Sequence, residues 1–494
     1  MSSLPRELYR REAVAAMDSA AIASGIPGYT LMRRAGAAVF AALRQRFDAR
    51  SRLLVLCGAG NNAGDGYVIA RLARQAGWRV SVASLADSTR LRGDAATACA
   101  HWRELGRVQR FDPAMIDDCD VIIDALLGTG LTRELEGDWR QVVEAVNGSA
   151  RAVVAVDMPS GLDADSGAIH GVAVEAGLTV SFIGLKQGLF TASGRQCRGE
   201  LLFDDLGVAP AIIAGQSPSA WLLDERVLQK LPRRRQDSHK GDFGHVLIVG
   251  GNHGMAGAVA LAAKAALKSG AGRVSVLSRP EHVAIVTGLC PEAMVHASAN
   301  GEIASPLLAA ASQVLIGPGL GQDAWAARLL YQVRHASQPV LYDADALNLL
   351  AREDAKRQRT TLPDNACVIT PHPGEAARLL QCSSRDVQRQ RFEAVARCQR
   401  HAQAVVVLKG SGTLVHDGEG IHVCDAGTAA MASAGMGDVL AGVIAAWLAQ
   451  GLPASLAARI GVVVHARAAE QAAAGADRGV LAGDVIAHLH GVAG

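Results

Sequence analysis

The sequence predicts an α/β protein made of two different domains joined end to end. Short apolar segments that suit strands alternate with helical segments along most of the chain, which is typical of parallel sheets covered by helices. Aromatic residues make up only 4% of the sequence, which suits such sheets better than aromatic-rich sandwiches. The chain has 494 residues, more than one hydrophobic core usually serves. We expect a doubly wound first domain over residues 1–212 and a second α/β domain over residues 213–494, with a linker near residues 209–216.

The composition also excludes several classes of protein. Hydrophobic residues form 50% of the chain and charged residues 19%, which favours globular cores over disorder. The net charge of +2 and the clearest basic run, which is short and isolated at residues 233–235, give no nucleic-acid footprint. Nine cysteines without a CxxC pair predict a reducing, cytoplasmic setting. Charged residues near the N-terminus argue against a secretory signal, and the longest apolar stretch, residues 439–449, predicts a buried helix too short to span a bilayer.

The first domain opens with a helical segment over residues 7–45 and a short buried strand over residues 53–56. A glycine-rich turn over residues 57–66 and a helix over residues 67–75 follow this strand, an arrangement that can cradle phosphate. The turn differs from the dinucleotide pattern GxGxxG because it contains two asparagines and an aspartate. Further strands of the predicted right-handed parallel sheet lie at residues 79–83, 121–124 and 152–156, with shorter strands between 179 and 203.

Three polar loops follow strands of this domain, at residues 61–66, 124–134 and 157–163. Loops at the carboxyl ends of parallel strands form ligand sites, although a single Asp at a strand end is also common as a helix cap or turn residue. Asn62, Asp124 and Ser160 offer only oxygen ligands, which suits a hard cation. With one carboxylate among the three, a monovalent ion is at least as good a candidate as magnesium. Asp157 would then be left as an acid or a base.

The second domain repeats the architecture with other motifs. A strand over residues 245–249 leads through a glycine-rich turn into an Ala-rich helix that ends at Ser269. Polar or glycine-rich loops again stand at the ends of strands. The further strands are predicted at residues 274–277, 314–316, 340–342, 368–369 and 405–408, and the loops at 317–321, 343–348, 370–375 and 409–413.

Two stretches of this domain suit nucleotide chemistry. The sequence KGSGT at residues 409–413 supplies an ammonium, two glycines and two hydroxyls after an apolar strand, although it is not a Walker A loop. The sequence GMGD at residues 435–438 opens an apolar helix, whose first N–H groups can hold a phosphate. Asp438 beside that phosphate makes sense mainly as a base for an attacking hydroxyl, or else as a helix cap. His372 is either structural or a substrate contact, and Asp343 and Asp345 either orient substrate or metal or cap a helix.

These motifs together resemble the bifunctional NAD(P)H-hydrate repair enzymes, in which an NAD(P)HX epimerase domain precedes an ADP-dependent NAD(P)HX dehydratase domain. The resemblance covers almost the whole chain and implies a Rossmann-like first domain and a ribokinase-like second domain. Ala63 where the family usually has glycine, and Met436 where GTGD is common, are mild departures. The motifs that carry the resemblance are GNNAGDG, DALLGTGL and DMPSGLD in the first domain, and KGDFGHVLIVGG, GMAGA, IGPGLG, DADALN, HPGE, KGSGT and GMGDVLAG in the second.

The resemblance implies a role for each matched position. In the first domain Asn62, Asp124 and Ser160 should hold potassium, and Asp157 should act near the epimerised centre. In the second domain Asp438 should be catalytic and should face the hydrate together with Ala258, Gly319 and His372. The hydrated dinucleotide should contact, besides Asp157, Asn61, Asn62, Ala63, Gly64, Asp65, Gly128, Thr129, Gly130, Leu131, Thr132, Arg133 and Glu134, and the adenine nucleotide should contact Lys409, Gly410, Ser411, Gly412, Thr413 and Gly437.

The implied activity is the repair of hydrated NADH and NADPH. The first domain would interconvert the (R) and (S) hydrates, and the second would dehydrate the (S) form with ADP and magnesium, releasing AMP and phosphate. The partners would be these small molecules and further copies of the chain in a homo-oligomer, with no nucleic acid and no membrane. The alternative is a ribokinase-like kinase of a vitamin precursor with a non-catalytic N-terminal binding module.

Overall fold

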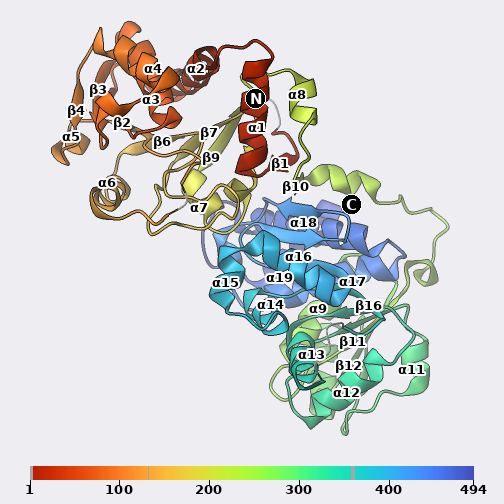
Figure 1. The fold of residues 1–494 in the computed structure, drawn as a ribbon. Coiled ribbons are helices and arrows are strands. Elements are labelled where there is room, and N and C mark those ends of the chain that lie inside the picture. Colours follow the sequence, from red (N-terminus) through yellow and green to blue (C-terminus); the bar gives the residue numbers. More distant parts are fainter. Residues whose placement is uncertain (1–3, 132, 358–361, 494) are drawn as a thin grey trace. The chain divides into compact units, whose positions relative to one another are not determined.

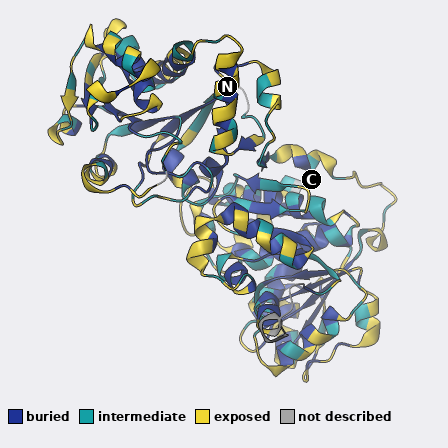
Figure 2. Cartoon of the chain, viewed as in Figure 1, coloured by how far each residue is buried: buried dark blue, intermediate teal, exposed yellow. Residues whose placement is uncertain are grey.

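The computed structural model describes residues 4–131, 133–357 and 362–493. Within it the chain forms two compact units, and the division falls after Trp221 (Figure 1). The predicted linker contains a short helix, α8 (Pro210–Ala214). The functional boundary between residues 212 and 213 therefore stays a prediction. In both units the central sheet strands are buried, whereas the edge strands β4, β9 and β13 are partly exposed, and most other exposed residues lie on the helices and loops (Figure 2).

Unit 1, which ends at Trp221, contains a seven-stranded parallel sheet, as the alternation of apolar segments predicts. The strand order is β4-β3-β2-β5-β6-β7-β9. Its strands are β2 (Arg52–Cys57), β3 (Arg79–Ser84), β4 (Val108–Arg110), β5 (Val121–Ala125), β6 (Ala152–Val156), β7 (Leu178–Phe182) and β9 (Glu200–Asp204). The short strand β1 (Glu7–Tyr9) pairs with β8 (Leu185–Lys186) and with the start of β10 (Ala220–Leu223). The helices are α1 (Arg11–Ala23), α2 (Gly28–Arg46), α3 (Asn61–Gln75), α4 (Gly93–Arg103), α5 (Ala114–Asp117), α6 (Gly137–Asn147), α7 (Gly194–Arg198) and α8.

The glycine-rich stretch after β2 differs from its prediction. Of the expected turn over residues 57–66, residues 61–66 instead form the first turns of α3, which begins at Asn61, and only residues 58–60 connect β2 to this helix. Two of its glycines permit close packing of this helix. A Cβ on Gly66 would lie 2.7 Å from the Ala125 side chain, and one on Gly64 would lie 2.5 Å from Met32. The glycines therefore let α3 approach β5 and α2, a tertiary requirement that the local sequence pattern does not separate from a turn.

Unit 2, which begins at Leu222, has a second sheet of order β13-β12-β11-β14-β15-β16-β17-β18-β19. The strands from β13 to β17 are parallel, and β18 and β19 add antiparallel edges. The six predicted strands are present, whereas β13, β18 and β19 were not predicted. The strands are β11 (His245–Val249), β12 (Arg273–Ser278), β13 (Met294–Ala297), β14 (Gln313–Ile316), β15 (Val340–Tyr342), β16 (Ala366–Ile369), β17 (Val405–Leu408), β18 (Thr413–His416) and β19 (Ile421–Cys424). The helices are α9 (Ala256–Lys268), α10 (Val283–Leu289), α11 (Ser305–Ala309), α12 (Ala324–Arg334), α13 (Ala344–Arg357), α14 (Pro373–Leu379), α15 (Ser384–Arg389), α16 (Arg391–Ala402), α17 (Met436–Ala449), α18 (Ala454–Ala473) and α19 (Ala482–Ala493).

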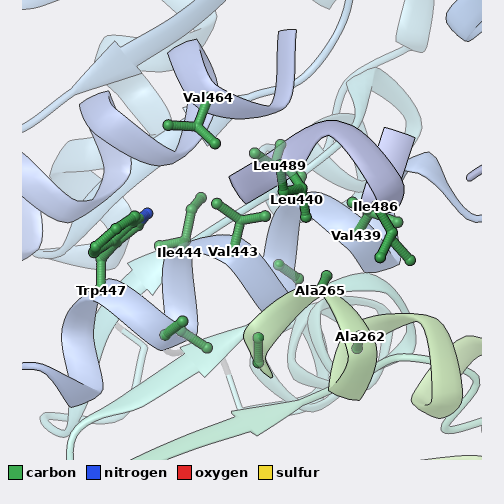
Figure 3. Close-up of a cluster of buried hydrophobic side chains, with 14 of the residues drawn as sticks. Ala262, Ala265, Val439, Leu440, Val443, Ile444, Trp447, Val464, Ile486 and Leu489 are labelled. Atoms are coloured by element: carbon green, nitrogen blue, oxygen red, sulfur yellow. The ribbon is translucent and has the colours of Figure 1, made fainter. Parts of the chain in front are cut away.

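The core of unit 2 is built around the apolar helix α17, which is buried as predicted. Side chains of α17, α18 and α19 gather over the alanines of α9 (Figure 3). A Cβ on Gly442 would lie 2.3 Å from the carbonyl oxygen of Ala262, so glycine lets the backbones of α17 and α9 approach closely. Among the described residues no helix is long and apolar enough to cross a membrane. This core fixes the N-terminus of α17, where Asp438 lies.

Candidate active sites

Unit 1 contains a cavity of about 640 Å³ at the carboxyl end of its sheet. The predicted residues that line it are Asn61, Asn62, Asp65, Gly128, Thr129, Gly130, Leu131, Arg133 and Asp157. Ala63 and Gly64 are buried in α3 instead, and Glu134 is exposed. Thr132 lies outside the described residues. The three polar loops predicted from the sequence thus contribute to one cavity, together with residues of α1, α2 and α4 that the motifs did not indicate.

The proposed cation ligands occupy a buried polar corner of this unit. Asp124 is completely buried, and its carboxylate accepts hydrogen bonds from Ser160 Oγ (2.6 Å) and from the Ser160 backbone N–H (2.8 Å). Burial raises the pKa of Asp124 to about 6, although these hydrogen bonds oppose the shift. The buried amide nitrogen and oxygen of Asn62 have no hydrogen-bond partner among the described residues. The structure brings Asp124 and Ser160 together, and the unsatisfied amide of Asn62 is buried in the first turn of α3. One carboxylate, one hydroxyl and one amide oxygen are a donor set that fits a single monovalent cation.

A divalent site would need more acidic or imidazole ligands. In the described parts of the chain, three or more His, Cys, Asp or Glu side chains do not gather in any group that could hold a metal ion. The donor set around Asp124 is therefore oxygen-rich but carries a single negative charge.

Asp157 is held by a lysine that lies outside the sequence motifs. Lys186 is 1% exposed, and its ammonium donates to Asp157 Oδ1, to the carbonyl oxygen of Phe182 (3.0 Å) and to Ser181 Oγ (3.3 Å). Asp157 itself has a left-handed backbone, with φ of 65°. Lys186 is the one lysine among the first 212 residues of the sequence, a signal that could have identified it. A buried ammonium beside a strand-end carboxylate indicates a functional pair.

Two further carboxyls line the same cavity. Burial raises the pKa of Asp65 well above its usual range, with Asp157 and Asp18 adding to the shift and Lys186 opposing it. Burial also raises the pKa of Asp18, which lies on α1. The cavity thus combines a carboxylate paired with an ammonium and carboxyls that hold their protons more tightly, which is the arrangement of an acid and base pair.

In unit 2, four charged side chains at strand ends and helix starts come together: Asp343, Glu375, Lys409 and Asp438. Lys409 Nζ lies 2.7 Å from Asp343 Oδ1 and 3.8 Å from Glu375 Oε2. It also lies beside α17, since a Cβ on Gly437 would be 3.4 Å from Nζ. Burial alone would lower the pKa of Lys409, but Asp343 and Glu375 outweigh it and the pKa is raised. The ammonium predicted to meet a nucleotide is thus also paired with the carboxylate of Asp343.

Asp438 stands at the start of α17, within the field of this cluster. The helix is preceded by Gly435 in the left-handed region (φ 87°), and Asp438 lies in its first turn. Burial raises the pKa of Asp438 to about 7; Asp343 adds to the shift and Lys409 opposes it. Burial likewise raises the pKa of Glu375 to about 7. A carboxyl with a pKa near neutrality beside a helix N-terminus can accept a proton while the N–H groups hold an anion.

The remaining predicted residues of unit 2 surround these groups. His372 caps α14: its Nδ1 accepts from the Gly374 N–H (2.9 Å), and its Nε2 lies 3.2 Å from Glu375 Oε1. Burial lowers the pKa of His372, so the ring is neutral near pH 7. A Cβ on Gly319 (φ 55°) would lie 3.1 Å from the Ala258 side chain, which places these two predicted residues side by side. Asp345 accepts from the Gly321 N–H (3.0 Å) and so holds the loop that contains Gly319.

The KGSGT loop is held by the buried side chain of Arg391, a residue that the motifs did not indicate. Arg391, at the start of α16, is completely buried. Its guanidinium donates to the carbonyl oxygens of Leu408 (3.2 Å), Lys409 (3.2 Å) and Gly412 (3.4 Å). Three carbonyls held by one fork-shaped group keep the loop between β17 and β18 in a fixed shape.

The two sites define a class of protein, a two-unit α/β enzyme. One unit has carboxyls suited to acid and base chemistry in a cavity, and the other has a carboxyl at a helix N-terminus that could hold phosphate. Residues 246–490 match the family model described as NAD(P)H-hydrate dehydratase, and residues 28–188 match the model of the YjeF-related protein N-terminus. The bifunctional NAD(P)H-hydrate repair enzyme of Coxiella burnetii is 44% identical over 98% of both chains. The enzyme of the same description from Escherichia coli is 42% identical over 94% of this chain and 89% of its own.

Solved structures resemble about half of the chain. A hypothetical protein from Streptococcus mutans matches with a TM-score of 0.51 and 30% identity, covering 55% of this chain and 100% of that one. A ribokinase-like superfamily protein from Enterococcus faecalis matches with a TM-score of 0.50 and 30% identity, covering 55% and 94%. The chain belongs to the bifunctional NAD(P)H-hydrate repair enzymes, and the predicted combination of a Rossmann-like and a ribokinase-like domain is confirmed.

Proposed function

We propose that this protein repairs hydrated NADH and NADPH in two steps. Unit 1 interconverts the (R) and (S) hydrates, and unit 2 uses ADP to dehydrate the (S) hydrate, with release of AMP and phosphate. The observation that carries the proposal is the position of Asp438, with a pKa of about 7, at the start of α17 and within the field of the Lys409 cluster. Family membership supplies the substrate.

The dehydration step follows from the chemistry of the hydrate. Water added across the nicotinamide ring leaves a hydroxyl, and hydroxide is a poor leaving group near neutral pH. Asp438 takes the hydroxyl proton while the oxygen attacks the β-phosphoryl group of ADP, the bond to AMP breaks, and phosphate becomes the leaving group. The lone pair of the ring nitrogen then expels phosphate and a proton is lost from the neighbouring carbon, which restores the dihydropyridine.

The other predicted residues of unit 2 bind and orient the reactants in this proposal. Lys409, the loop over residues 410–413 and Gly437 contact the nucleotide, while Ala258, Gly319 and His372 face the hydrate. Asp343 and Glu375 offer the oxygen donors that magnesium takes together with substrate phosphates. When bound, magnesium would neutralise charge on the phosphates.

In unit 1, Asp157 is the base at the epimerised centre, and the loops at residues 61–66 and 128–134 bind the dinucleotide. Asn62, Asp124 and Ser160 would hold potassium, which would compensate the buried charge of Asp124. We place the protein in the cytoplasm, which agrees with its nine free thiols, and we propose that it forms a homo-oligomer.

One assay tests the proposal as a whole. A mixture of (R) and (S) hydrate with ADP, magnesium and potassium should give NADH in two phases, as the (S) hydrate is consumed first and the (R) hydrate follows through epimerisation. AMP and free phosphate should appear in equal amounts with NADH. A stable phosphorylated product without NADH would instead support the alternative, a small-molecule kinase.

The variant Asp157→Asn distinguishes the activity of unit 1 from that of unit 2 in this assay. It should lose the second phase and keep the first, since unit 2 is unchanged. A normal second phase in this variant would refute the assignment of Asp157.

A further inference from the structure

Lys186 lies outside every motif that carries the family resemblance, yet it is one of the most buried charged side chains of unit 1. All three N–H groups of its ammonium have an acceptor: Asp157 Oδ1, the Phe182 carbonyl oxygen and Ser181 Oγ. A satisfied ammonium has no donor left for a substrate. Lys186 therefore acts through Asp157.

The hydrogen bonds that the Asp157 carboxylate accepts all end on one of its oxygens, Oδ1. Oδ1 accepts from Lys186, from Ser181 Oγ (3.2 Å) and from the Phe182 backbone N–H (3.2 Å). None of these three donors binds Oδ2, while Asp157 lines the cavity. The anchored oxygen fixes the carboxylate, and the other oxygen is left to meet a substrate hydroxyl.

The backbone around this pair is strained at two positions. Asp157 has φ of 65°, and Ile183, in the turn that leads from β7 to Lys186, has φ of 62°. A β-branched residue in the left-handed region is an outlier, because its branched side chain crowds the backbone there. Both residues line the cavity. Strain that is retained at a cavity is typical of a functional site, where the surrounding structure holds the side chains in place.

Four other charged side chains line the cavity beside Asp157 and Lys186. Asp18 comes from α1, Asp65 from α3 and Asp94 from α4, and Arg133 comes from the loop after β5. Burial raises the pKa of Asp65, and the negative charges of Asp157 and Asp18 raise it further. The protonated form of Asp65 is thus favoured, whereas Asp157 is paired with the ammonium of Lys186.

We propose that Lys186 is the positioning residue that holds Asp157, the base of the epimerisation, by one carboxylate oxygen, and that Asp65, which lines the same cavity, is the proton donor. This inference rests on the proposed epimerase function of unit 1. Asp157 removes the proton of the hydrate hydroxyl, the carbon–nitrogen bond of the ring opens, and a carbonyl forms at that carbon. The electron pair goes to the ring nitrogen, which takes the proton of Asp65. After rotation of the carbonyl the nitrogen attacks its other face and both protons return, so no further reactant is needed.

The test uses the full chain and the two-phase assay. Lys186→Met and Asp65→Asn should keep the first phase and slow the second by about 100-fold or more, the range of general acid–base catalysis, with spontaneous epimerisation as the floor. Lys230→Met and Asp118→Asn, exposed side chains outside both sites, should leave both phases unchanged.

The pH dependence separates positioning from a merely structural role. In Lys186→Met the base loses its ammonium, so the remaining second-phase rate should reach its plateau only at higher pH than in the wild type. Lys186→Arg, which keeps the charge, should recover part of the rate. A second phase within a few-fold of wild type in Lys186→Met, or an equal loss at every pH without recovery in Lys186→Arg, would overturn the role of Lys186.

Each remaining outcome also has a definite meaning. A normal second phase in Asp65→Asn would overturn the role of Asp65. If Asp157→Asn abolishes the second phase while Lys186→Met does not, the proposed function stands and this inference fails. If the second phase is normal in Asp157→Asn, the proposed role of Asp157 as the base is refuted, and the inference about Lys186 and Asp65 falls with it.

Discussion

The replacement Asp438→Asn tests the chemistry of unit 2 most directly. It keeps the size and the hydrogen-bonding capacity of the side chain but removes the base, so ADP-dependent dehydration should fall by about 100-fold to 10,000-fold. Epimerisation in unit 1 should stay at the wild-type rate. Asp477→Asn, which changes an exposed aspartate of the same unit, is the matched control.

The pKa of Asp438 gives the magnitude of the pH effect. With a pKa of about 7, the carboxyl is ionised to about one tenth at pH 6 and to about nine tenths at pH 8. The base must be ionised, so kcat/KM of the wild type should rise about tenfold between these pH values, toward a plateau above the pKa. Glu375 has a pKa of about 7 as well, so the pH profile of the wild type does not by itself identify the titrating residue. The variant Asp438→Asn does, because its remaining activity should lack the rise with pH that Asp438 causes.

The same carboxyl should weaken the fold of unit 2 at high pH. Its pKa is raised in the folded state, so the folded protein binds the proton more tightly, and stability falls as pH rises from about 4 through about 7. The shift of about 3 units sets a ceiling of about 4 kcal/mol, and partial exposure reduces the effect. Asp438→Asn should therefore be more stable than wild type at pH 8, by about 1 kcal/mol or more in chemical unfolding, and show no gain at pH 4.

Two results would refute this reasoning. Wild-type dehydration in Asp438→Asn would exclude Asp438 as the base. A loss of both activities together, with a lower midpoint of unfolding at pH 8, would show that Asp438 supports the fold instead of the reaction.

Three further changes test other parts of the structure. Lys409→Met should lower the rate of dehydration at least about 100-fold. It should also destabilise unit 2 by about 3–5 kcal/mol, because it leaves the buried carboxylate of Asp343 without its ammonium. Normal activity and stability of this variant would contradict the pairing of Lys409 with Asp343. Asp124→Asn should remove the dependence of epimerisation on potassium, measured against tetramethylammonium, while dehydration is unaffected; an unchanged potassium dependence would exclude this site. Gly442→Ala should destabilise unit 2 by about 1–3 kcal/mol in chemical unfolding because the new Cβ meets the Ala262 carbonyl, whereas Gly483→Ala in α19, with open space around it, should be neutral or stabilising; equal effects would show that α9 and α17 are not so closely packed.

The sequence by itself determined the fold class and most of the strands. Apolar segments of strand length and their alternation with helical segments are local patterns, and so are the polar residues that follow each strand. Because parallel strands end at one edge of a sheet, the placement of Asp124 and Asp157 could be inferred without knowing the order of the strands. The sequence patterns also indicated Lys409 and Asp438 as residues of one site.

Only the tertiary structure decided which groups meet and in what charge state. The pairing of Lys409 with Asp343 joins residues 66 positions apart, and the contact of Lys186 with Asp157 depends on a strained turn that no local pattern predicts. The glycines of α3 were interpreted as a turn because a requirement for close packing and a requirement for a bend select the same residue. The pKa of Asp438 depends on burial and on neighbours from distant strands, so the residue type could suggest a base, and the three-dimensional surroundings alone set its pKa near neutrality.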